Sequence, residues 1–79
     1  MKLDELRKRI AEELNVDPAC LTGNAGPGTL AEWDSMGSLG IISVLDSASR
    51  GSITSEEAEQ LVSFEAVVSL ARKKGILED

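Results

Sequence analysis

The sequence predicts an all-α fold: a small four-helix bundle made by a single domain, residues 1–79, with a long loop between helices 1 and 2 and a short third helix. Apolar residues recur every three or four positions in several segments, and residues typical of helix caps border those segments. No segment shows the sustained two-residue alternation that a half-buried strand would need. With 79 residues, the chain is close to the lower limit at which one core stabilises a fold unaided.

The first helix is predicted near the start of the chain. Leu3, Leu6, Ile10 and Leu14 recur at three- and four-residue steps between charged residues. This spacing predicts an amphipathic helix of about twelve residues, which Asn15 ends.

A short turn and a long loop are predicted next. Asp17-Pro18 is typical of an N-cap followed by proline at the first helical position, so one short turn is expected through Cys20-Leu21. The segment TGNAGPGTL, from Thr22 to Leu30, contains three glycines, a proline and an asparagine and is predicted to be a loop. No Gly-Lys-Ser/Thr follows, which argues against a phosphate-binding loop. So long a connection suggests that the first and second helices run antiparallel.

The second helix is predicted to begin at Asp34 and to end at Arg50-Gly51. We expect most of this helix to be buried, because its apolar residues cover more than one stripe. The inward row is predicted to be Met36, Leu39, Ile42 and Leu45, widened by Ile41, Val44 and Ala48.

Two helices are predicted after Gly51. Thr54-Ser55-Glu56-Glu57 has the capping-box form and predicts a short helix through Leu61. Ser63 is the expected cap of the last helix, which Gly75 ends after a basic last turn, Arg72 to Lys74. The residues of this helix that we expect to face inward are Phe64, Val67, Val68 and Ala71.

The composition excludes several classes of function. The chain has no histidine, one cysteine and two aromatic residues, which leaves no Ser-His-Asp triad, no structural zinc site and no stacking platform for single-stranded nucleic acid. The formal net charge is −6, and between Ile10 and Ala71 the only basic residue is Arg50. Such a surface would repel nucleic acid and anionic membranes and would attract a basic protein, although it is also common as a solubilising surface.

The location expected from the sequence is the cytoplasm. The start, MKLDELRKRI, is too charged for a signal peptide, and no run approaches the roughly 20 apolar residues that span a bilayer. A single cysteine, Cys20, allows no internal disulfide and fits a reducing compartment. We expect a monomer that does not insert into membranes.

Ser35 has three competing interpretations. In the first, Asp34 caps the helix and Ser35 has no function of its own, which is the commonest situation for an Asp-Ser pair. It can be a nucleophile, but no histidine is present, every lysine is near a terminus, and the G-x-S-x-G elbow would need glycine where Trp33 stands. It can also be an attachment point, because the start of a helix favours a covalently bound phosphate.

Two segments resemble acyl carrier proteins. EWDSMGSLGIISVLD, residues 32–46, is similar to the phosphopantetheine attachment segment of that family, and ITSEEAE, residues 53–59, is similar to the family's Ile-Pro-Asp-Glu-Glu-Ala-Glu at the same distance beyond the serine. The resemblance covers nearly the whole chain. It implies that a separate phosphopantetheinyl transferase attaches 4′-phosphopantetheine from coenzyme A to Ser35. It also implies that acyl-loading and acyl-transferring enzymes are the other partners, and that the protein itself is not an enzyme.

The resemblance also gives a set of motif and partner-binding residues, expected at Asp34, Met36, Gly37, Gly40, Asp46, Ile53, Glu56, Glu57 and Glu59. The exposed face of the second helix, usually acidic in that family, is expected here to be a stripe of small residues: Gly37, Gly40, Ser43 and Ser47. One hypothesis is that this stripe lets a partner approach closely.

The cargo stays open at this point. A specialised lipid, polyketide or related pathway fits the resemblance, as does fatty acid biosynthesis more broadly. Asp-Ser-Met-Gly also occurs in carriers of D-alanine, so an aminoacyl carrier is an alternative. A helical protein-interaction domain that is never modified is the alternative from another class.

Overall fold

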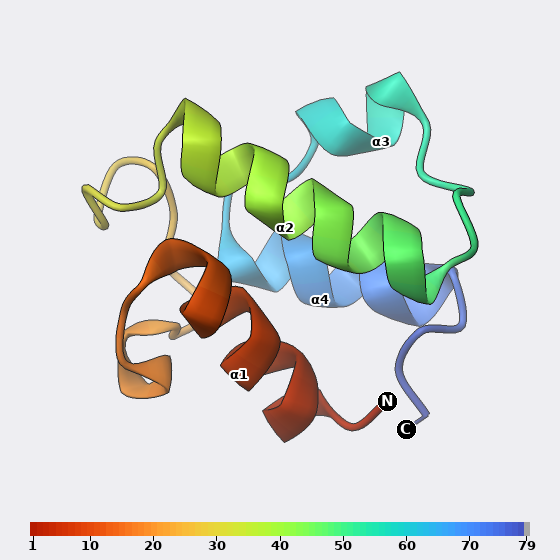
Figure 1. Ribbon diagram of the computed structural model, residues 1–79, viewed down its shortest axis with the longest axis horizontal. Helices are drawn as coiled ribbons and strands as arrows, with labels where there is room; N and C mark the ends of the chain where they lie inside the picture. The colour runs from red at the N-terminus through yellow and green to blue at the C-terminus, as the bar shows by residue number, and fades with distance from the viewer. Residues whose placement is uncertain (79) are drawn as a thin grey trace.

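The protein is all-α, as the sequence predicted. The computed structural model describes residues 1–78, which contain helices and no strand and span 28 × 24 × 18 Å. The helices, labelled in Figure 1, are α1 (Leu3–Leu14), α2 (Ser35–Ala48), α3 (Ser55–Glu59) and α4 (Phe64–Lys73), with a single 3-10 turn at Pro18–Cys20.

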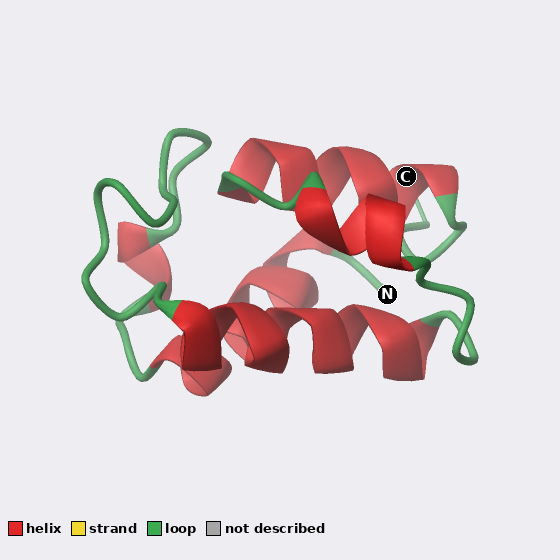
Figure 2. Ribbon diagram, turned by 90° about the horizontal axis from the view of Figure 1, so that it is seen from above, coloured by secondary structure: helices red, strands yellow, loops and turns green. Residues whose placement is uncertain are grey.

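The helices α1 and α2 run in opposite directions and pack against each other, as expected from the long loop between them (Figure 1). The third long helix, α4, lies behind them in this view, and the short α3 connects the end of α2 to the start of α4. Figure 2 shows from above how α2 and α4 form two sides of the molecule, with the loop between α1 and α2 gathered at one end. None of the described helices is both long and apolar enough to cross a membrane.

The core is one cluster of buried apolar side chains. The residues predicted to face inward from α1 and α4 are buried, except for Leu3, which is half-buried. Trp33, which precedes the cap of α2, is the largest fully buried side chain. Its indole Nε1–H is buried without a hydrogen-bond partner among the described residues.

The predicted helix caps are confirmed. Asn15 ends α1 with a φ of 58°, and the Asp17 side chain accepts a hydrogen bond from the Ala19 amide at 2.8 Å. The Ser63 hydroxyl accepts a hydrogen bond from the Ala66 amide at 3.1 Å. The capping box of α3 also forms, but α3 ends at Glu59 rather than continuing to Leu61.

The loop between α1 and α2 is bound to the start of α4. The amides of Phe64 and Glu65 donate to the carbonyls of Ala25 and Gly23, at 2.7 and 3.2 Å. Gly26 passes so close to this corner that a Cβ there would lie 2.6 Å from the Val62 carbonyl oxygen. Gly26 therefore serves packing, because it lets the loop lie against the start of α4.

The predicted inward face of α2 is wrong at three residues, while Ile41 and Leu45 are buried and Ile42 and Val44 pack against the core, as expected. Met36 and Leu39, expected inside, are 76% and 61% exposed, and Ala48 is also exposed. The buried row is Gly37, Ile41 and Leu45, at steps of four residues.

Glycine explains this orientation of α2. A Cβ on Gly37 would meet the Glu32 carbonyl oxygen and would lie 2.6 Å from Leu14 Cδ2, and one on Gly40 would lie 2.7 Å from Glu13 Oε2. The two glycines let α1 approach α2 closely, so they face α1 and are not part of an exposed stripe. Of the four small residues expected on the exposed face, only Ser43 and Ser47 are exposed.

Candidate functional site

Ser35 is the first residue of α2 and is exposed. Its hydroxyl makes no hydrogen bond within the described chain. The preceding residue, Asp34, is the N-cap: its Oδ1 accepts a hydrogen bond from the Gly37 amide at 2.9 Å, and its carbonyl accepts one from the Ser38 amide at 2.8 Å. The cap is therefore complete without Ser35, which leaves the serine hydroxyl available for chemistry.

The helix start also leaves two donors unused. Within residues 1–78, the amides of Ser35 and Met36 donate to no acceptor. Unpaired amides and the partial positive charge of a helix N-terminus favour an anionic group beside them. A phosphate ester on Ser35 would be next to both amides.

The exposed α2 side chains that continue from Ser35 are uncharged over two turns, and Glu13 of α1 lies beside them at Gly40. Leu39 is one turn from Ser35 on the same face, Ser43 follows one turn later, and Met36 flanks the serine. The sequence prediction missed the exposure of Leu39. The spacing of Gly37 and Gly40 was the available signal, because two glycines on one helix face indicate the close approach of another helix.

The predicted partner-binding residues Asp46 and Ile53 are joined to each other. Both are half-buried, and Asp46 Oδ1 accepts a hydrogen bond from the Ile53 amide at 3.4 Å. The Ile53 side chain packs against the core. These two residues fasten the end of α2 to the segment that leads into α3.

Glu57 is also engaged within the molecule. Its carboxylate accepts a hydrogen bond from the Thr54 amide at 3.0 Å and pairs with Lys74 Nζ at 2.8 Å. The hydrogen bond from Lys74 is the main cause that lowers the pKa of Glu57 from 4.5 to about 2, and the bond from the Thr54 backbone adds to it. Of the predicted acidic partner residues on α3, only Glu56 and Glu59 are exposed and make no ion pair with another described residue.

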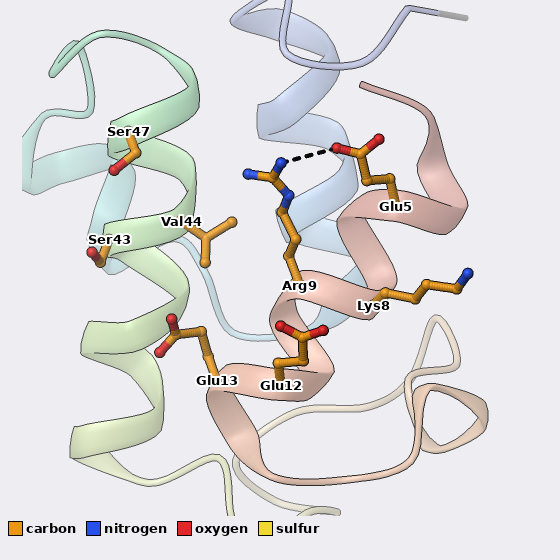
Figure 3. A pocket seen from close by; sticks show the side chains of 8 residues that line it. All are labelled: Glu5, Lys8, Arg9, Glu12, Glu13, Ser43, Val44 and Ser47. Carbon is orange, nitrogen blue, oxygen red and sulfur yellow. Dashed lines mark ion pairs between the residues drawn. The ribbon is translucent and has the colours of Figure 1, made fainter.

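A groove of about 610 Å³ separates α1 from the second half of α2 (Figure 3). Its lining is mixed in charge, and Arg9 and Glu5 form an ion pair of 3.1 Å within it. The remaining lining residues are Lys8, Glu12, Glu13, Ser43, Val44 and Ser47. Ser35 and its neighbours in the first two turns of α2 do not line this groove, so the candidate site is the helix start itself.

Comparison with known proteins adds no assignment. No family model matches the chain, and no curated protein matches it. Among residues 1–78, no group of three acidic or cysteine side chains is placed to hold a metal ion.

Proposed function

We propose that the protein is an acyl carrier whose Ser35 receives 4′-phosphopantetheine from coenzyme A, in a specialised lipid, polyketide or related biosynthetic pathway. The observation that supports this most directly is the state of the Ser35 hydroxyl. It is exposed and unpaired at the first position of a helix that the preceding residue, Asp34, already caps. The Asp34-Ser35 pair and the acidic segment after Ile53 support the proposal further, because both resemble segments of acyl carrier proteins.

The attachment reaction needs a second protein. Ser35 Oγ would form a bond to the phosphorus atom next to pantetheine, the phosphoanhydride bond of coenzyme A would break, and adenosine 3′,5′-bisphosphate would leave. The hydroxyl proton has to pass to a base, and this chain has no histidine and no lysine near Ser35 in the sequence. The transferase would supply that base, and the chain would supply an accessible acceptor held by a helix.

The residues around Ser35 fit a phosphopantetheine group. The free amides of Ser35 and Met36 can donate to the phosphodiester, and the exposed Leu39 face leaves room for the arm to leave the surface. When bound, the arm supplies a terminal thiol that holds an acyl group as a thioester. A flexible arm also raises the effective concentration of that group at successive active sites.

The test is the intact mass after incubation with coenzyme A and a broad-specificity phosphopantetheinyl transferase. We expect one phosphopantetheine increment on the wild-type protein and none on Ser35→Ala. The matched control is Ser43→Ala, an exposed serine two turns further along the same face of α2, which should gain the full increment. An unchanged wild-type mass with several transferases would overturn the proposal.

The exposed apolar pair Met36 and Leu39 favours a second candidate function, a helical protein-interaction domain that is never modified. The same mass measurement separates the two candidates, because only the carrier gains an increment. An aminoacyl carrier of the D-alanyl type would gain it too, so a positive result would next require loading with acyl and aminoacyl substrates.

A further inference from the structure

The groove between α1 and the second half of α2 is lined by groups that can form hydrogen bonds to a ligand. Two exposed serines of α2, Ser43 and Ser47, line it and make no side-chain hydrogen bond to another described residue. On the α1 side, Arg9 is already paired with Glu5 at 3.1 Å, and Lys8 points away from α2 (Figure 3). The hydroxyls of α2 are therefore open to a neutral, elongated ligand.

Val44 and Glu13 add an apolar contact and an acceptor. The Val44 side chain points from α2 toward α1, and Glu13 extends from α1 toward α2 (Figure 3). A Cβ on Gly40 would lie 2.7 Å from Glu13 Oε2, which places this carboxylate at the end of the groove nearer to Ser35. A saturated acyl chain would cover these polar groups without bonding them, which is costly. A chain that contains amides can donate to the carboxylate and accept from the serine hydroxyls.

A group attached to Ser35 can reach this groove. Along the helix axis, Ser43 is about 12 Å and Ser47 about 18 Å beyond Ser35. From Ser35 Oγ to its sulfur, phosphopantetheine has about 14 bonds, the chain length of roughly 4.5 residues, so it extends to about 16 Å. The two amides of the arm can therefore come beside Ser43 while the phosphodiester stays at the helix start.

We propose that the groove between α1 and α2 is the resting site of the phosphopantetheine arm on Ser35, and that it binds the amide-bearing arm rather than the acyl chain. The inference rests on the proposed function and adds a binding site for the attached group. Because the arm is tethered, its effective concentration at the groove is of the order of millimolar. A few hydrogen bonds and one apolar contact with Val44 are then enough to hold it.

The experiment locates the arm by NMR in the modified protein. Wild-type protein is converted completely with coenzyme A and a phosphopantetheinyl transferase, as intact mass verifies, and its amide shifts are compared with those of the unmodified protein. We expect shift changes at Ser43, Val44 and Ser47 as well as beside Ser35. We also expect nuclear Overhauser effects between the geminal methyl groups of the arm and the Val44 methyl groups.

Two variants test whether the groove is the binding site. Ser43→Trp fills the groove where the arm would enter it. Ala48→Trp is the matched control, because Ala48 is also exposed on α2 but does not line the groove. We expect Ser43→Trp to lose the contacts between the arm and Val44, and Ala48→Trp to keep them. Circular dichroism of both unmodified variants checks that the exposed substitutions leave the fold intact.

The outcomes separate this inference from the proposed function. Shift changes confined to the residues beside Ser35, with no contact to Val44, would overturn the inference alone. Contacts of the arm with Leu61 and Leu70, which line a smaller groove of about 340 Å³, would do the same, and so would equal contacts in the two variants. A wild-type protein that gains no mass increment would overturn the proposed function together with this inference.

Discussion

The starts of α2 and α3 use the same position of the helix in opposite ways. In α3, Thr54 caps the helix and Glu57, three residues later, bonds back to the Thr54 amide and pairs with Lys74. In α2, Asp34 caps the helix, and the residue three positions later is Gly37, which has no side chain to return the bond. The amide of the cap residue is therefore bonded at the start of α3, whereas the Asp34 amide has no acceptor within residues 1–78. At both starts, the amides of the first two helical residues and the hydroxyl of the first, Ser35 or Ser55, have no partner among these residues.

The difference follows from packing. A side chain at position 37 would collide with the Glu32 carbonyl and the Leu14 side chain, so α1 leaves no space there for a residue that could close the cap. At the start of α3, the third residue is Glu57, whose carboxylate also pairs with Lys74, the residue after α4. Close packing one turn into a helix can therefore leave the amide of its cap residue without a return bond.

The largest effect is expected from filling the space at Gly37. Gly37→Ala should destabilise the protein by about 2–3 kcal/mol, because the new methyl group meets a backbone carbonyl and a core side chain. The matched control is Gly28→Ala, where a Cβ would have no neighbour within 4 Å. We expect this control to change the free energy of unfolding in urea by no more than about 0.5 kcal/mol. Equal stabilities of the two variants would show that α1 and α2 are further apart than described.

The next effect is the loss of stability when the cap residue of α2, Asp34, or that of α3, Thr54, is replaced. Asp34→Ala removes the side-chain bond that caps α2 and should cost about 1–2 kcal/mol, while Asp34→Asn, which keeps an acceptor oxygen, should recover most of the loss. Thr54→Ala should cost about 0.5–1 kcal/mol, because Lys74 and the Glu57 carboxylate still hold α3. Urea unfolding measures all three variants. A larger loss for Thr54→Ala than for Asp34→Ala would reverse the comparison.

The smallest effect concerns the pH dependence of the stability that Glu57 contributes at the start of α3. The pKa of Glu57 is lowered to about 2 in the folded protein, from 4.5 when unperturbed. Because the folded pKa is depressed, the stability that Glu57 contributes is present above about pH 4.5 and is lost as the pH falls towards 2. We expect Glu57→Gln to be less stable than wild type at pH 6 and the difference to shrink between pH 4.5 and 2. A difference that stays constant across that range would show that the ionised carboxylate does not stabilise α3.

Most of the fold could be predicted because its determinants are local. The caps at Asp17, Thr54 and Ser63 depend on residues within three positions, and the sequence contains all of each motif. The inward faces of α1 and α4 could also be predicted, since each helix has one clear apolar stripe between charged residues.

The orientation of α2 could not be predicted in the same way. Apolar residues occupy more than one of its stripes, so periodicity alone allows the Met36–Leu39 row or the Gly37–Ile41 row to face inward. The choice depends on Leu14 and Glu32, which meet Gly37 only after folding. The candidate site shows the same limit. The Asp34-Ser35 pair located the candidate site in the sequence. Only the structure shows that Asp46 and Glu57 bind partners within the molecule and that Leu39 is exposed.

The burial of Trp33 has an optical consequence. It is the only tryptophan, the chain contains no tyrosine, and the indole is 1% exposed two residues before Ser35. Indole emission moves to longer wavelength when water reaches the ring, so the intrinsic fluorescence of this protein reports on one place alone. Any ligand or modification that loosens or tightens the segment leading into α2 changes that emission, and the protein needs no attached dye to show it.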